Sequence, residues 1–202
     1  MVLSVHGCSG FELWYNFGME EIKIEKKEVA CDITEPSIEL KDSYLAALDE
    51  FQKEGLNLHR DITEIASDFP KYIKYLEDDS KGLTGDPSRV PQTTYWIVDK
   101  DGYAGRVSIR HELNDKLLRW GGHIGYEVRP TKRRLGYGEK ALRLALPKAR
   151  AMGLKRVMIS CDSTNIGSKK IIEANGGVLE NEVPGEDGGP TKLRYWVDLE
   201  KI

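Results

Sequence analysis

The sequence has few cysteines, no long apolar run and little net charge, and each shortage excludes a class of protein. Its three cysteines stand at unrelated spacings, which suits neither a disulfide framework nor a zinc site. No apolar run approaches the length of a membrane-spanning helix. A formal net charge of −3 gives no nucleic-acid-binding footprint. We therefore expect a cytoplasmic protein with no metal, no membrane association and no nucleic-acid partner.

The length of 202 residues is that of one domain, with room for a short addition. Residues 1–18 lack the basic start and the continuous apolar core of a signal peptide. Met19 opens a charged stretch that looks like a more natural beginning. We therefore interpret 1–18 as a possible N-terminal extension and 19–202 as a single domain.

Local hydrophobic patterns predict a mixture of strands and helices. Apolar residues three and four apart indicate helices, whereas β-branched and aromatic runs between turn residues indicate strands. The runs 93–98 and 104–110, with a turn between them, predict a hairpin. In chain order, the predicted elements are strands at 22–24 and 30–33, helices at 43–55, 62–69 and 72–76, strands at 93–98, 104–110 and 124–128, a helix at 141–152, a strand at 157–161, a helix at 165–175, and strands at 179–183 and 193–199.

The most distinctive stretch is a strand, a basic glycine-rich turn and a helix. The apolar strand 124–128 ends before Pro130, and the basic residues Arg129, Lys132, Arg133 and Arg134 surround the turn. Two glycines follow, and then the helical pattern. The free amides at a helix start favour an anion, glycine lets that anion come close, and arginine binds phosphate oxygens. The stretch predicts a pyrophosphate site; the alternative is a solvated basic turn without a ligand.

The segment 136–141 also satisfies the G-x-G-x-x-A pattern of dinucleotide-binding proteins. In that fold the strand feeds almost directly into the first glycine, whereas here residues 129–135 intervene. A whole dinucleotide cofactor would also need two such units, and one is found, at 124–161. The spacing therefore argues against a nicotinamide cofactor.

Two motifs at matching separation resemble the GNAT superfamily of N-acetyltransferases. The first, Arg133-x-x-Gly136-x-Gly138 after a strand, resembles the acetyl-CoA signature of that family. The second, Asn165-x-x-Ser168, opens the next predicted helix, as in the family. The resemblance covers at least residues 93–199, and the run 121–130 looks like a bacterial branch of predicted acetyltransferases.

The resemblance implies an α/β (α+β) fold whose mixed, largely antiparallel sheet is flanked by helices and has a splayed central strand pair. The early helices would flank the acceptor pocket, and the loop 78–91 is expected to border it. One departure is Gly177, which stands where the family usually has Phe. Members of the family commonly dimerise, so a homodimer is a possible partner.

The resemblance also implies the reaction, which is direct attack of a primary amine on the thioester of acetyl-CoA, without a metal or a covalent intermediate. The amine would belong to a small polar molecule or to a protein or peptide. The strand backbone at 126–128 would hold the pantetheine arm and the acetyl carbonyl, and the amides of 133–138 the pyrophosphate. The cofactor residues assigned in this way are Tyr126, Glu127, Val128, Arg133, Arg134, Leu135, Gly136, Tyr137, Gly138, Asn165 and Ser168.

Amine attack needs a general base, and the leaving thiolate can use a general acid. Glu127 and His123 lie near the splay and are the candidate bases; an outward strand carboxylate and a structural histidine are the ordinary alternatives. Many family members carry a tyrosine as general acid where this chain has Ile172. We therefore consider Tyr195, Tyr137 or solvent as substitutes.

Other functions stay open at this point. The missing tyrosine fits an acyl-CoA-binding regulatory module without efficient transfer. Cys161 at a strand end could accept an acyl group, but no activating base is identifiable from spacing, and a buried structural cysteine is more common. A nucleic-acid-binding protein that uses the arginine turn is disfavoured by the overall acidity.

Overall fold

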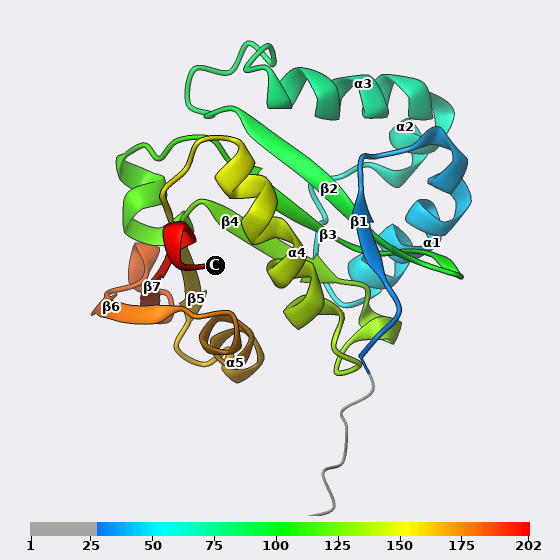
Figure 1. Cartoon of the computed structure of the whole chain (residues 1–202). Coiled ribbons are helices and arrows are strands. Elements are labelled where there is room, and N and C mark those ends of the chain that lie inside the picture. Colours follow the sequence, from blue (N-terminus) through cyan, green and yellow to red (C-terminus); the bar gives the residue numbers. More distant parts are fainter. Residues whose placement is uncertain (1–27) are drawn as a thin grey trace, which may run out of the picture.

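The computed structural model describes residues 28–202. The possible extension 1–18 and the predicted strand at 22–24 lie outside the described residues. Two sheets stand side by side in Figure 1, with helices on both faces of the first sheet and others next to the second. No helix in the described part of the chain is long and apolar enough to cross a membrane.

Seven strands and five α-helices follow one another in the described residues. They are β1 (Asp32–Thr34), α1 (Lys41–Lys53), α2 (Ile62–Ser67), α3 (Phe69–Ser80), β2 (Gln92–Asp99), β3 (Gly102–Arg110), β4 (Ile124–Val128), α4 (Tyr137–Ala151), β5 (Arg156–Asp162), α5 (Ile166–Ala174), β6 (Val178–Val183) and β7 (Lys192–Asp198). Short 3₁₀ turns lie at Ile38–Leu40, Pro130–Lys132, Glu186–Gly188 and Leu199–Lys201, and a π-helical turn at Leu117–Gly121.

The strands form two antiparallel sheets, with the order β1-β2-β3-β4 in one and β5-β7-β6 in the other. Between β4 and β5, the described residues form only an isolated bridge, from Gly122 to Ile159. Next to it, the amide of His123 donates to the carbonyl of Met158 at 2.7 Å. Beyond this point the two central strands separate, which confirms the predicted splayed pair.

Helix α4 and the pair α1 and α3 lie on opposite faces of the first sheet. Successive side chains of a strand point to opposite faces. Ile97 and Ala104 belong to a core that includes the buried stripe of α4, while their neighbours Trp96 and Tyr103 pack with residues of α1 and α3. The α4 core continues onto β5 and β7, through residues such as Val157, so that one helix joins the two sheets.

One predicted helix boundary was wrong, and its position matters for the site. The sequence placed Pro70 at the end of a helix, followed by one or two turns. Instead, Pro70 lies in the first turn of the twelve-residue helix α3, and the Asp68 side chain caps that turn by accepting from the amide of Lys71. Proline is tolerated there because the first helical amides have no intrahelical partner. The longer helix carries Asp79 toward the loop that follows.

Candidate active site

The helix α4 begins at a glycine turn, and its first amides, those of Tyr137 and Gly138, have no intrahelical partner. Gly136 precedes it with φ of 95°, a left-handed conformation that favours glycine, and no side chain of residues 28–202 caps the first turn. At Gly138, a Cβ would lie 2.8 Å from Cδ1 of Ile171 on α5, so a larger residue there would have to displace the end of that side chain. The turn therefore has both the conformation and the free donors that an anion needs.

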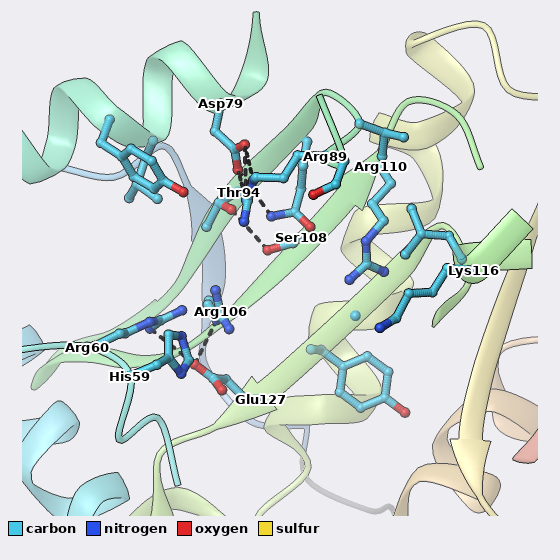
Figure 2. Close-up of a pocket in the computed structure, with 18 of the residues that line it drawn as sticks. His59, Arg60, Asp79, Arg89, Thr94, Arg106, Ser108, Arg110, Lys116 and Glu127 are labelled. Atoms are coloured by element: carbon cyan, nitrogen blue, oxygen red, sulfur yellow. Dashed lines mark hydrogen bonds and ion pairs between the residues drawn. The ribbon is translucent and has the colours of Figure 1, made fainter. Parts of the chain in front are cut away.

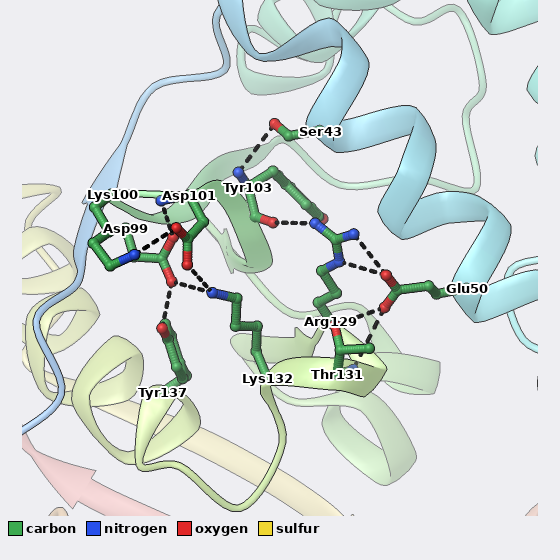
Figure 3. Close-up of polar contacts among 10 residues, drawn as sticks. All are labelled: Ser43, Glu50, Asp99, Lys100, Asp101, Tyr103, Arg129, Thr131, Lys132 and Tyr137. Carbon is green, nitrogen blue, oxygen red and sulfur yellow. Dashed lines mark hydrogen bonds and ion pairs between the residues drawn. The ribbon is translucent and has the colours of Figure 1, made fainter.

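Two of the basic residues near this turn are used for structure (Figure 3). The Arg129 guanidinium bonds to the Glu50 carboxylate of α1 at 2.6 Å. The Lys132 amine lies 2.8 Å from the Asp99 carboxylate and 2.7 Å from that of Asp101, at the end of the β2–β3 hairpin. These ion pairs fix the turn against α1 and the hairpin.

The other two arginines have different freedom. Arg133 bonds to Glu54 at 2.6 Å and donates to the carbonyl of Val128 at 3.2 Å. Arg134 has a positive φ of 61° and an exposed side chain that makes no ion pair within residues 28–202. Leu135 beside it is 59% exposed. The Arg134 side chain can therefore bind an anion directly. Arg133 can bind one only after its ion pair with Glu54 breaks.

The second sequence motif meets β4, the strand that precedes the first motif. Tyr126 of β4 and Ser168 of α5 share a hydrogen bond of 2.6 Å between their hydroxyl oxygens. The Asn165 side chain caps α5 by accepting from the amide of Ser168 at 2.9 Å. Tyr137, another predicted cofactor residue, is buried and donates its hydroxyl to Asp99. The structure therefore brings Tyr126, Asn165 and Ser168 together. The Tyr137 side chain instead links the start of α4 to Asp99 at the end of β2.

A cavity of about 580 Å³ opens over β4, on the face of the first sheet that carries α3. Its floor comes from β2, β3 and β4, and its walls come from the segment after α1, from α3, from the loop 81–91 and from residues 114–117. The loop that was expected to border an acceptor site contributes Ser88, Arg89 and Val90. Figure 2 shows a lining dominated by polar side chains, many of them basic.

Glu127 is the predicted base that lines this cavity (Figure 2). Its carboxylate, with 23% of the side chain exposed, accepts from Arg106 at 2.7 Å and from the Asn57 side chain at 3.1 Å. Burial acts to raise the pKa of Glu127, but the charges of Arg106 and Arg60 and the bond from Asn57 outweigh it, and the pKa is lowered. Glu127 is therefore ionised at neutral pH.

His123 and Tyr195 lie elsewhere and do not line the cavity. The Nδ1 atom of His123 accepts from the amide of Met158 at 2.9 Å, and burial and nearby cations lower the pKa of the ring to about 4. The Tyr195 hydroxyl donates to Glu173 at 3.2 Å, and burial together with Glu173 raises its pKa to about 12. Both side chains bridge elements of the core. Their catalytic roles stay predictions that this geometry does not favour.

Cys161 is a buried thiol, and burial and the charge of Asp162 raise its pKa above the ordinary cysteine value. A protonated thiol is a poor nucleophile. Among residues 28–202, no group of three or more His, Cys, Asp or Glu side chains could hold a metal ion.

The sequence interpretation missed the arginines of the cavity. Arg106, Ser108 and Arg110 alternate along β3 with the buried Val107 and Ile109. A period of two places the three polar side chains on one face of the strand. This alternation was a usable signal, because a charged face on an internal strand needs either partners or a ligand.

A family model for the acetyltransferase (GNAT) domain matches residues 64–178, which is more than half of the chain. The protein therefore belongs to the GNAT acetyltransferase family. This confirms the family, the fold and the acyltransferase class that the sequence motifs predicted. A comparison with curated protein sequences found no match.

Solved structures of this fold superpose on most of the chain. RimJ from Mycobacterium smegmatis in complex with CoA-disulfide is 17% identical, with a TM-score of 0.64, over 85% of this chain and 83% of that chain. The microcin C7 self-immunity acetyltransferase MccE, in complex with acetyl-CoA and AMP, is 15% identical, with a TM-score of 0.61, over 84% and 92%. A chimera of the spermidine N-acetyltransferase SpeG from Vibrio cholerae and hSSAT is 13% identical, with a TM-score of 0.59, over 86% and 98%. At these identities the likeness shows a shared fold.

Proposed function

We propose that the protein is an acetyl-CoA-dependent N-acetyltransferase whose acceptor, a primary amine, binds in the cavity on β4. One observation carries this proposal. Tyr126 lines the cavity and also bonds across the gap to Ser168, and the next residue, Glu127, presents its carboxylate to the cavity. The predicted cofactor groove and the acceptor cavity thus share two consecutive residues of one strand.

The residues of the groove fit a CoA thioester. The amides of Tyr137 and Gly138, which no side chain of residues 28–202 caps, and Arg134, which makes no ion pair within those residues, suit a pyrophosphate. The open edges of β4 and β5 suit a pantetheine arm. RimJ and MccE, which share the fold, were crystallised with CoA species. When bound, acetyl-CoA supplies an acetyl group that is activated for attack by an amine.

Glu127 is the proposed base, acting directly or through one water molecule. Its carboxylate is ionised and can take a proton from the acceptor. Arg106 and Arg60 lower the pKa of Glu127, so its carboxylate binds a proton only weakly. A proton taken from the acceptor is therefore released readily to solvent. The two arginines also fix the carboxylate in place.

Tyr126 is the proposed proton donor to the leaving thiolate. Ile172 fills the position of the usual family tyrosine and is fully buried. The Tyr126 hydroxyl lies at the gap, and burial raises its pKa to about 12, so that it stays protonated at neutral pH. In this proposal Tyr126 takes the role of general acid that the sequence had suggested for Tyr195, because the Tyr195 hydroxyl is bonded to Glu173.

The test is release of the CoA thiol in the presence of a panel of primary amines. We expect release with at least one amine, a fall in turnover for Glu127→Gln, and unchanged acetyl-CoA affinity in that variant. Binding of acetyl-CoA without thiol release for any amine would instead favour the regulatory-module alternative. The single domain over 19–202, a cytoplasmic location and a homodimer are further parts of this proposal, supported by the family resemblance.

A further inference from the structure

The cavity carries an excess of positive charge. Cationic side chains outnumber carboxylates there by five to two. The cations are Arg60, Arg89, Arg106, Arg110 and Lys116, and the carboxylates are Asp79 and Glu127. Whatever binds in this cavity therefore meets a positive field, which low-dielectric walls strengthen.

Both carboxylates are already engaged. Asp79, only 3% exposed, is held by Arg89 at 2.9 Å. Glu127 is held by Arg106 at 2.7 Å and faces Arg60 at 3.7 Å. These contacts leave Arg110 without a carboxylate.

Arg110 has no ion pair with any residue in 28–202. Its guanidinium donates to the carbonyls of Gly122 at 2.8 Å and Gly121 at 3.5 Å, and the charge of Asp79 acts on it only from beyond ion-pair distance. Burial, followed by the charges of Arg106 and Arg89, lowers the pKa of Arg110 below the ordinary arginine value. A half-buried guanidinium under repulsion from other arginines is stabilised by any anion that reaches it.

The space beside Arg110 is open (Figure 2). The guanidinium lies over Gly125 of β4, since a Cβ built on that glycine would be 3.9 Å from Nη1. Ser108, opposite Gly125 in the sheet register, adds a buried hydroxyl to the floor. The amine of Lys116 points toward the same space in Figure 2, and it is bonded at the rim to Glu186 at 2.7 Å.

We propose that the acceptor is a small primary amine that carries an anionic group, a carboxylate or a phosphate, and that Arg110 binds this group. The inference rests on the proposed acetyltransferase function and names the substrate class for it. Gly125 and Glu127 are two residues apart on one face of β4, a separation of about 7 Å. A molecule with its amine and its anion a few bonds apart reaches from Arg110 to Glu127.

The same charges disfavour other acceptors. A polyamine would place two or more positive charges among five cations. A monoamine without an anionic group is itself a cation at neutral pH, so it would leave Arg110 without an ion pair and would be repelled by the positive field. The volume of about 580 Å³ suits a small molecule and lies within the usual range of ligand pockets.

The test compares amines that differ in one anionic group. Alanine is paired with alaninamide, and O-phosphoethanolamine with ethanolamine; thiol release gives kcat and KM for each. We expect the anionic member of at least one pair to have the higher kcat/KM, and the two pairs separate carboxylate from phosphate recognition. Inorganic phosphate should compete with that acceptor in the wild type.

Substitutions then locate the anion. Arg110→Gln should raise KM for the anionic acceptor about 10- to 100-fold, the effect of losing hydrogen bonds to a charged group, with little change for its neutral partner. It should also abolish competition by phosphate. Arg110→Lys keeps the charge and should recover part of the affinity. Arg150→Gln, which removes an exposed guanidinium of α4 outside the cavity, should behave as the wild type.

The outcomes separate this inference from the function on which it rests. Equal or better use of the neutral amines, or an Arg110→Gln variant that keeps the preference and binds acetyl-CoA normally, overturns the anionic acceptor and leaves the acetyltransferase intact. Absence of thiol release with every amine overturns both. Unchanged thermal melting and acetyl-CoA affinity in Arg110→Gln exclude loss of folding as the cause.

Discussion

The hydroxyl of Tyr126 lies 2.6 Å from that of Ser168, and this bond joins β4 to α5 across the gap between the two sheets. The residues are 42 positions apart in the chain, and both were assigned to the predicted acetyl-CoA site, Tyr126 on the strand before the first motif and Ser168 in the second motif. In the account given above, the gap receives the cofactor arm and the β4 side receives the acceptor. The proposed cofactor groove and the acceptor cavity therefore meet at two consecutive residues of β4, Tyr126 and Glu127.

Glu127→Gln should lower kcat about 100-fold or more, as expected when a general base is lost, and leave acetyl-CoA affinity within about twofold. Glutamine keeps the shape and can still accept a hydrogen bond from Arg106. Steady-state rates with a saturating amine, together with a binding titration, separate the two effects. Wild-type rates in this variant would show that Glu127 does not act as the base.

The pH profile carries a second prediction for Glu127. Its folded pKa is lowered, so protonation of this carboxylate inactivates the enzyme only below about pH 4.5, its ordinary value. Arg106→Gln removes a cation that lowers this pKa, while burial still raises it. We expect the acid limb of kcat/KM to move to higher pH in Arg106→Gln. A limb at the same pH in both proteins would contradict the assignment.

Tyr126→Phe should lower turnover about 100-fold, because the thiolate loses its proton donor. Ser168→Ala is the matched control, since it removes the same hydrogen bond and keeps the phenol. Rates of thiol release for the two variants are compared at equal acetyl-CoA saturation. Equal losses in both would mean that the hydrogen bond positions β4 and that Tyr126 donates no proton.

Lys132→Gln should reduce the free energy of unfolding by about 1–3 kcal/mol at pH 7. The reason is that the Asp99 side chain, which is 4% exposed, loses its ion pair with Lys132. Burial raises the pKa of Asp99, but bonds from Lys132 and Tyr137 outweigh it and the folded pKa is lowered. Such a group stabilises the fold above its unfolded pKa, near 3.8, and the effect is lost as pH falls through the lower folded value. The difference between variant and wild type should therefore shrink below about pH 4.

Denaturant unfolding at several pH values measures this difference. Lys100→Gln is the control, because Lys100 pairs with the neighbouring Asp101 at the surface and is 88% exposed. Exposed pairs of this kind contribute little. A Lys132→Gln variant as stable as Lys100→Gln would show that the ion pairs of Lys132 in Figure 3 do not hold the turn.

The features that the sequence predicted well are those that depend on interactions between residues close together in the chain. The glycine at 136, the helix that follows and the hairpin before β4 depend on residues close together in the chain, and each formed as expected. The roles of Arg129 and Lys132 could not be predicted in this way. Their partners Glu50 and Asp99 lie 79 and 33 positions away, so only the folded chain shows that these cations are already paired.

The candidate site was predictable on its cofactor side and much less so on its acceptor side. A helix start with glycines gives the same geometry in many chains, so Gly136 could be placed from spacing. Ser168 could be placed in the first turn of the next helix because Asn165 is a typical capping residue. The cavity instead assembles β3, β4, α3 and the loop before β2, and Arg110 acquires its meaning from charges on all of them. That arrangement is a property of the tertiary structure.

The most direct test of the account is calorimetric titration of the protein with acetyl-CoA, in parallel with NAD, for the wild type and for Gly136→Glu. We predict binding of acetyl-CoA but not NAD to the wild type, and loss of that binding when a carboxylate at residue 136, which has φ of 95°, occupies the anion site. Melting curves confirm that the variant is folded. Equal affinity of a folded Gly136→Glu protein for acetyl-CoA, or no binding by the wild type, would contradict the assignment of this turn as the cofactor site.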